Sequence, residues 1–267
     1  MTEKPASPPA LNAAQMAAPS FRLAALDQDF LLGDSMRGVR FLLEYAKAEE
    51  ALRAWGVRST IVVFGSARIA EDGPGEHARW YRAARDFGRI CSERGGARDA
   101  DRDGWRDNVI ATGGGGGVMG AANRGAADVG APSIGYNIRL PFEQQPNPWS
   151  TPDLTFQFHY FGMRKMHFAM RANALVVFPG GYGTLDELFE ILTLTQTGKS
   201  SPMPIILFDR AYWCAALNLE HLAQNGMIDP ADLNLFDYAE TAEEAWAKLV
   251  AGGVKEGNGA PVAGHLR

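Results

Sequence analysis

The sequence has little cysteine and no clustered histidine. Its 267 residues include two cysteines, Cys91 and Cys214, and five histidines that lack the spacing of a metal site. Two cysteines cannot build the disulfide framework of a small secreted protein, and these two do not have the spacing of metal ligands. We therefore expect no metal site, and the cysteine content is typical of a reducing compartment.

Long apolar runs and an excess of positive charge are also missing. No apolar stretch is long enough to span a bilayer, and residues 1–20 lack the continuous apolar segment of a signal peptide. The formal net charge of -5 gives no general attraction to nucleic acid or to an anionic membrane. The sequence predicts a soluble cytoplasmic protein that binds neither, in which any phosphate site must be a local arrangement.

What the chain does have is a regular alternation of short apolar runs with helical stretches. Residues 1–25 are rich in Ala and Pro and are expected to be disordered, residues 26–252 to form one nucleotide-binding domain with an extra N-terminal helix, and residues 253–267 to form a loose tail. The pattern predicts strands at 60–64, 108–111, 133–138, 154–158, 174–178 and 204–208. It predicts helices at about 34–55, 76–93, 118–128, 162–172, 185–197, 211–224 and 242–250. This order is typical of a doubly wound α/β domain, a parallel sheet with helices on both faces.

The stretch 174–199, ALVVFPGGYGTLDELFEILTLTQTGK, carries the strongest functional signal. A buried strand leads into the glycines of residues 179–183, where we expect a tight turn with positive φ. Thr184 is the expected N-cap of the helix that follows, and Gly198 ends that helix. Unpaired N–H groups and the helix dipole then point at one spot, which predicts a phosphate site.

Two more glycine turns follow predicted strands, after Phe64 and after Ala111. In a parallel sheet the carboxyl ends of the strands meet at one edge, and ligands bind beyond that edge. The sequence therefore predicts that all three glycine turns surround a single site.

Three other motifs are weaker. Residues 115–120 match the dinucleotide fingerprint G-x-G-x-x-G, but strand 133–138 has no acidic residue to hold a ribose, which disfavours NAD. A helix packed close to the sheet, or a smaller phosphate-bearing ligand, explains these glycines equally. Residues 198–200 resemble the end of a P-loop, but Thr193 stands where that motif needs glycine. Residues 99–104 resemble the start of a calcium loop, but Ile110 replaces the bidentate Glu, so a solvated acidic turn is favoured.

Glu187 and the pair Arg164 and Lys165, in or near the stretch 174–199, each allow two interpretations. Glu187 stands at the third position after Thr184, so the two residues fit a capping box, and a carboxylate beside the anion pocket fits equally well. Arg164 and Lys165 fit the solvated start of a helix. A cationic pair there opposes the helix dipole, however, which favours another use.

Residues 179–187, PGGYGTLDE, fit the P-G-G-x-G-T-x-x-E signature of the Lonely Guy family of cytokinin-activating phosphoribohydrolases, long mislabelled lysine decarboxylases. The resemblance continues in Phe64-Gly65-Ser66, in the glycine run to Gly120 and in Met163-Arg164-Lys165, and it covers roughly residues 60–207. Residues 41–55 and the C-terminal helix resemble the longer bacterial branch. The resemblance implies a Rossmann-like fold and hydrolysis of the N-glycosidic bond of a nucleoside 5'-monophosphate, AMP or an N6-modified AMP, to free base and ribose 5-phosphate without a cofactor.

The resemblance also implies the site residues. Arg164 and Glu187 correspond to the family's essential residues. The implied substrate-binding residues are Ser66, Gly115, Gly117, Met119, Glu143, Arg164, Lys165, Gly180, Gly181, Tyr182, Gly183, Thr184, Leu185, Asp186 and Thr193. Gly116 and Gly120 depart from the longer relatives, which bears on the shape of the glycine loop. Since sites in the family are completed across a dimer, we expect a homodimer or a larger homo-oligomer.

The chemistry assigns roles to the two essential residues. Cleavage of an N-glycoside passes through an oxocarbenium-like state, whose positive charge a carboxylate can stabilise, and Glu187 is expected to do so. Arg164 would anchor the phosphate or interact with the departing base. The alternative is a carrier of a phosphate-bearing cofactor such as molybdenum cofactor. The presence of both residues favours the enzyme.

Overall fold

The computed structural model describes residues 11–141 and 145–257 of the chain. Contacts between residues divide the chain into two units, residues 1–46 and 47–267, and each unit is described by itself. The helix predicted at 34–55 is present as α3 (Arg37–Ala54) and contains the boundary between them.

The described part of the first unit consists of short helical segments and the beginning of a longer helix. They are α1 (Ala13–Ala17), η1 (Pro19–Phe21), η2 (Ala24–Leu26), α2 (Gln28–Leu32), η3 (Asp34–Met36) and the beginning of α3. None of its described residues is buried. The disorder expected for residues 1–25 stays a prediction, and residues 1–10 lie outside the described residues.

The second unit is built on a parallel sheet. Its strands are β1 (Thr60–Phe64), β2 (Val109–Thr112), β3 (Ser133–Ile138), β4 (Thr155–Phe158), β5 (Ala172–Val177), β6 (Ile205–Phe208) and β7 (Asp237–Ala239). Its helices after α3 are α4 (His77–Arg94), α5 (Val118–Asp128), η4 (Pro152–Leu154), α6 (Phe161–Met170), α7 (Tyr182–Gln196), α8 (Arg210–Ala216), α9 (Leu219–Gln224), η5 (Pro230–Asn234) and α10 (Ala242–Ala251). Among the described residues these seven strands form one sheet in the order β4-β3-β2-β1-β5-β6-β7.

The doubly wound, Rossmann-like α/β fold expected from the sequence is therefore confirmed, with two local corrections. The single helix expected at 211–224 is two helices, because Leu217 is extended and the Asn218 side chain accepts from His221 N to begin α9. Strand β7 was missed, since its three residues are too few to show a period.

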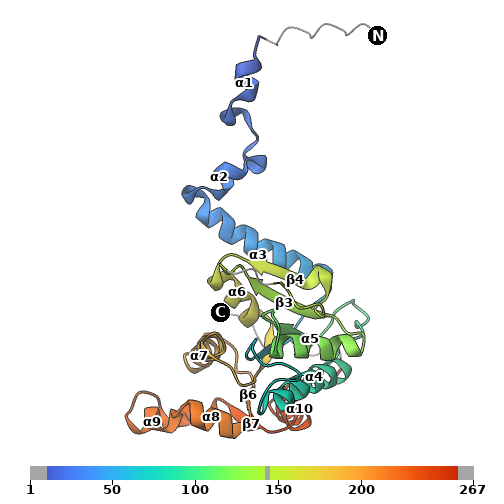
Figure 1. The fold of residues 1–267 in the computed structure, drawn as a ribbon, viewed down its shortest axis with the longest axis vertical. Helices are drawn as coiled ribbons and strands as arrows, with labels where there is room; N and C mark the ends of the chain where they lie inside the picture. Colours follow the sequence, from blue (N-terminus) through green and yellow to red (C-terminus); the bar gives the residue numbers. More distant parts are fainter. Residues whose placement is uncertain (1–10, 142–144, 258–267) are drawn as a thin grey trace. The chain divides into compact units, whose positions relative to one another are not determined.

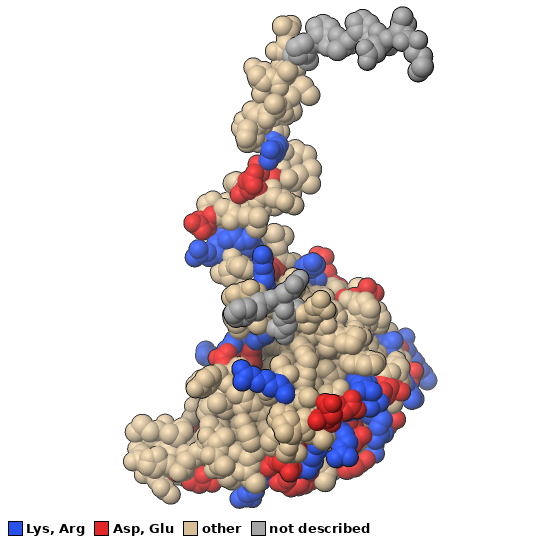
Figure 2. Space-filling view, viewed as in Figure 1, with Lys and Arg blue, Asp and Glu red and all other residues tan. Residues whose placement is uncertain are grey.

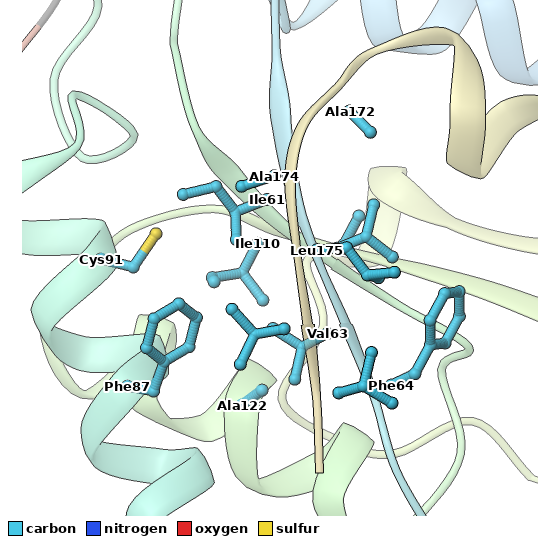
Figure 3. Close-up of a cluster of buried hydrophobic side chains, with 14 of the residues drawn as sticks. Ile61, Val63, Phe64, Phe87, Cys91, Ile110, Ala122, Ala172, Ala174 and Leu175 are labelled. Atoms are coloured by element: carbon cyan, nitrogen blue, oxygen red, sulfur yellow. The ribbon is translucent and has the colours of Figure 1, made fainter. Parts of the chain in front are cut away.

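Helices cover both faces of the sheet (Figure 1). On one face α4 packs against α5 and α10. Figure 3 shows Phe87 and Cys91 of α4 and Ala122 of α5 beside Ile61 and Val63 of β1, with Phe64 on the other side of the strand.

On the second face the ring of Phe64 packs edge-on against Phe168 of α6, with centroids 4.7 Å apart. All five residues of β1 are buried. Because strand side chains alternate between faces, a continuous buried run means that both faces are covered.

The outer surface over α4, α5 and α10 carries charges of both signs, interleaved as Figure 2 shows. Many of them are paired, as in Arg85–Asp128 and Arg94–Glu243. Exposed pairs of this kind contribute little to stability, at most about 1 kcal/mol each.

One less exposed ion pair fastens the end of α3 to the sheet. Arg171, just before β5, donates through both terminal nitrogens to the Glu49 carboxylate at 2.7 and 2.8 Å, and Arg53 donates to it at 2.7 Å. The hydrogen bonds from Arg171, aided by Arg53, outweigh burial and lower the pKa of Glu49 from 4.5 to about 2.

We expect Glu49→Gln to lower the free energy of unfolding by about 2 kcal/mol near neutral pH, which is the effect of the lowered pKa of Glu49 reduced for screening by solvent. Because the folded-state pKa is depressed, this stabilisation is present above about pH 4.5 and is lost as the pH falls towards 2. Urea unfolding of parent and variant at several pH values measures the difference. A difference that stays constant between neutral pH and pH 3 would contradict the assignment.

Candidate active site

The three glycine turns meet where the strand order reverses, between β1 and β5. Ser66 N, after β1, donates to Pro179 O at 3.0 Å, and Ser66 O accepts from Val118 N at 3.1 Å. The loop after β1 is thus bonded both to the turn after β5 and to the start of α5. In doubly wound sheets such a reversal point is where ligands bind.

Close packing explains two of these glycines. Gly117 has a φ of +63°, and a Cβ there would lie 2.2 Å from Ser66 O. A Cβ on Gly65 would lie 2.6 Å from the side chain of Val118. Glycine at both positions lets the first two turns pack together without side chains between them.

Helix α7 begins earlier than the sequence predicts. It starts at Tyr182 with Gly181 as N-cap, so the prediction that Thr184 is the N-cap was wrong. The positive φ expected in this turn was also wrong, because none of Gly180, Gly181 and Gly183 has a positive φ. The extended Gly181, with φ -97° and ψ -151°, lets the helix start directly after the strand.

The early start leaves backbone donors open. The first helical hydrogen bond runs from Leu185 N to Gly181 O at 3.0 Å. The N–H groups of residues 181–184 therefore have no acceptor within the helix. Among the residues that the structure describes, none accepts from them elsewhere.

The glycines of this turn fall into two kinds. A Cβ on Gly180 would lie 2.1 Å from Thr184 Oγ1, so Gly180 is required by packing. A Cβ on Gly181 or Gly183 would meet nothing within 4 Å. Neither backbone angle nor packing requires glycine at these two positions. Their missing side chains leave the open N–H groups accessible to a ligand.

We expect Gly183→Ala to separate folding from binding. Alanine in a helix is favoured over glycine by up to about 1 kcal/mol, so the melting temperature should not fall. The added methyl should weaken binding of ribose 5-phosphate roughly tenfold, because it stands beside the open N–H groups. Gly180→Ala is the matched control, since its methyl meets Thr184 and should lower the melting temperature. Unchanged affinity in Gly183→Ala would contradict an anion site at this turn.

A buried ion pair lies beside this turn. Arg164 of α6 donates through Nη2 to Glu187 Oε1 of α7 at 2.8 Å, and their side chains are 13% and 4% exposed. The guanidinium lies 5.2 Å from the ring centre of Phe161 and 5.7 Å from that of Phe168. Arg164 Nε is buried, and no described residue accepts from it. The pair thus keeps an unused donor in a low-dielectric environment.

The same contacts exclude one of the two interpretations of Glu187. Its carboxylate pairs with Arg164, and α7 has no side-chain cap, so the capping box is wrong. Burial raises the pKa of Glu187, and the positive charges of Arg164 and Lys165 offset only part of that rise. A buried carboxylate with a raised pKa is typical of functional sites.

Lys165 belongs to an open groove along α7. Its ammonium lies 2.8 Å from Asp186 Oδ1 and 2.9 Å from Glu190 Oε2. Burial would lower the pKa of Lys165, but these carboxylates outweigh it and raise the pKa. The groove encloses about 490 Å³ and is lined by Lys165, Tyr182, Leu185, Asp186, Phe189, Glu190, Thr193 and Leu194.

This groove brings together five of the residues expected from the sequence, namely Lys165, Tyr182, Leu185, Asp186 and Thr193. It adds Phe189, Glu190 and Leu194, which sequence reasoning missed. Helical spacing could have found them, because residues three or four positions apart share one face of a helix.

The other expected residues that the structure describes lie in the glycine loop after β2 or beside it. Ser66 Oγ accepts from Arg68 N at 3.1 Å, and Gly115 O accepts from Asn147 Nδ2 at 3.0 Å. Met119 is half-buried in α5, and its sulfur lies 2.8 Å from where a Cβ on Gly113 would stand. Glu143 lies outside the described residues.

The described part of the chain shows neither a metal site nor a membrane-spanning helix. Within residues 11–141 and 145–257, no group of three or more His, Cys, Asp or Glu side chains could hold a metal ion. In the same ranges no helix has the length and apolar character needed to cross a membrane. The expected oligomeric state stays a prediction.

The chain is similar in sequence to known proteins. Residues 119–249 match a family model described as "Possible lysine decarboxylase". A rice protein (Oryza sativa subsp. japonica) named "Probable cytokinin riboside 5'-monophosphate phosphoribohydrolase" is 30% identical over 196 residues, which cover 72% of this chain and 76% of that protein. A cytokinin riboside 5'-monophosphate phosphoribohydrolase of Arabidopsis thaliana is 28% identical over 145 residues, or 53% of this chain and 66% of that protein.

Among solved structures, the molybdenum cofactor binding protein of Rippkaea orientalis is similar with a TM-score of 0.49 and 20% identity. The match covers 73% of this chain and 96% of that protein.

Proposed function

Because this chain belongs to the Lonely Guy family of cytokinin riboside 5'-monophosphate phosphoribohydrolases, we propose that it hydrolyses the N-glycosidic bond of a nucleoside 5'-monophosphate. The substrate is AMP or an N6-modified AMP, and the products are the free base and ribose 5-phosphate. The observation that carries this proposal is the buried Arg164–Glu187 pair beside the open N-terminus of α7.

The phosphate binds at the start of α7. Four backbone N–H groups, those of residues 181–184, have no acceptor among the described residues. They lie at the positive end of the dipole of a helix that runs for 15 residues. Such a terminus favours an anion, and the open space at Gly181 and Gly183 admits one.

Glu187 stabilises the reacting sugar. As the bond between C1' and the base nitrogen lengthens, positive charge develops on the ribose ring. The Glu187 side chain is 4% exposed, so its negative charge is little screened by water and acts strongly on that cation. Water adds its oxygen to C1' and loses a proton, while the base keeps the bonding electron pair and gains a proton.

Arg164 has two tasks in this scheme. Its Nη2 holds Glu187 in place and favours the charged carboxylate. Its buried Nε still lacks an acceptor among the described residues, and a phosphate oxygen or a nitrogen of the departing base supplies one. A buried donor left without an acceptor costs about 1–3 kcal/mol, which substrate binding would recover.

The proposal is tested by release of free base from purified protein. We expect adenine or an N6-modified adenine from the 5'-monophosphate and little from the nucleoside, since phosphate binding positions the sugar. Glu187→Gln should reduce the rate about a hundred- to a thousandfold, because the amide supplies no negative charge. Equal rates on AMP and adenosine, or full activity in Glu187→Gln, would contradict the proposal.

Glu49→Gln is the matched control for this experiment. Glu49 is also a buried glutamate paired with arginine, but it lies by the amino end of β5, at the edge of the sheet opposite the glycine turns. It should lose stability and keep its rate of base release. A loss of activity as large as that of Glu187→Gln would mean that breaking any buried pair inactivates the protein.

The raised pKa of Glu187 predicts a pH profile. Only the carboxylate stabilises the cation, so kcat/KM should fall on the acid side around a pKa above the ordinary 4.5. The Lys165 charge lowers the pKa of Glu187 and the Glu190 charge raises it. Lys165→Gln should therefore move the acid limb to higher pH, and Glu190→Gln should move it to lower pH. Shifts in the same direction would show that another group controls this limb.

A further inference from the structure

The carbonyl of Gly180 is held from outside the turn. It accepts a hydrogen bond of 2.7 Å from the hydroxyl of Tyr212 in α8. Tyr212 lies near the turn because α8 follows β6, and β6 is the strand paired with β5. The sequence signature of the turn gives no sign of this partner.

The hydrogen bond restrains the whole peptide group between Gly180 and Gly181, not only the Gly180 oxygen. Gly180 C=O and Gly181 N–H belong to one planar trans peptide group, so they point in opposite directions. When the oxygen is directed to Tyr212, the Gly181 N–H is directed to the opposite side of the turn. That N–H is the first of the four open donors at the start of α7.

A peptide group at this position needs an external restraint. Glycine backbones adopt more conformations than any other residue, and Gly181 and Gly183 have no contacts that a side chain would make. Among the described residues, none accepts from Gly181 N–H itself. Among the described residues, the bond from Tyr212 is therefore the hydrogen bond that restrains the orientation of this peptide group.

Tyr212 is itself held rigidly. Its N–H donates to Asp209 Oδ1 at 2.9 Å, and Trp80 Nε1 donates to Asp209 Oδ2 at 2.8 Å. The rings of Trp80 and Tyr212 pack edge to face, with centroids 5.7 Å apart. Arg79 pairs with the same carboxylate. Asp209 is 4% exposed and keeps a φ of +72°, a strained value for a residue that is not glycine.

We propose that Tyr212 is a positioning residue, whose hydroxyl aims the Gly181 N–H at the phosphate of a bound sugar phosphate. The identity of that ligand rests on the proposed function. The position of the N–H does not, since it follows from the hydrogen bond and the geometry of the peptide group.

The test is Tyr212→Phe, which keeps the ring and removes only the hydroxyl. Loss of one hydrogen bond should weaken calorimetric binding of ribose 5-phosphate roughly three- to tenfold. KM for the nucleoside 5'-monophosphate should rise by a similar factor with kcat nearly unchanged, as expected when ground-state and transition-state binding are lost equally. Binding of free adenine, which has no phosphate, should not change.

Tyr238→Phe is the matched control. Tyr238 is a half-buried tyrosine of β7 that packs near α8, and its hydroxyl contacts Cys214 Sγ at 3.9 Å, not the turn. It should bind ribose 5-phosphate as the parent does. Melting temperatures of both variants show whether either change affects folding.

The outcomes separate this proposal from the proposed function. Parent-like binding of ribose 5-phosphate by Tyr212→Phe overturns the positioning role, and so does an equal loss of affinity for ribose 5-phosphate and adenine. A lower kcat with unchanged KM and unchanged affinity indicates a purely structural role and also overturns it. A parent protein that binds ribose 5-phosphate but releases no base overturns the proposed function alone. A parent that does not bind ribose 5-phosphate overturns the positioning role.

Discussion

Four backbone N–H groups at the start of α7 lack acceptors among the described residues, and much of the site is arranged around them. They are open because α7 begins directly after β5, with an extended Gly181 in place of a capping side chain. Unpaired N–H groups cost free energy wherever water cannot reach them. An arrangement that keeps them unpaired, free of side chains and at the reversal point of the sheet is suited to an anionic ligand.

The Arg164–Glu187 pair places a carboxylate near that helix N-terminus. An ion pair between a buried carboxylate and a largely buried guanidinium contributes little to stability, because desolvating both charges offsets their attraction. A hydrophobic pair would stabilise the contact between α6 and α7 equally well. A carboxylate in this position gives the protein a negative charge at a fixed place. In the proposed reaction such a charge stabilises the cation that develops on the sugar.

The sequence alone predicts the sheet, its helices and the edge at which the glycine turns meet. Those predictions rest on the periodicity of apolar residues along the chain, which is a local property. The alternation of strands with helices then implies that the strands are parallel. The N-cap prediction for Thr184 failed because Thr and Glu three residues apart form a capping box in many helices. Nothing in the local sequence indicates that the carboxylate of Glu187 forms an ion pair with Arg164 instead. The contact of Tyr212 with Gly180 spans 32 residues and depends on the strand order, so it could not be predicted either.

Placing the proposed phosphate site and the carboxylate on one helix has a further consequence. Thr184 and Glu187 are three residues apart, so a rise of about 4.5 Å along a rigid helix separates them. Their spacing is set by backbone hydrogen bonds, so binding of the proposed substrate would need no ordering of loops between them. The orientation that the helix itself does not fix is that of the peptide group before it, between Gly180 and Gly181. Helices α8 and α4 restrain it through Tyr212, Asp209 and Trp80, so elements far from the turn in sequence help to set the geometry of its donors.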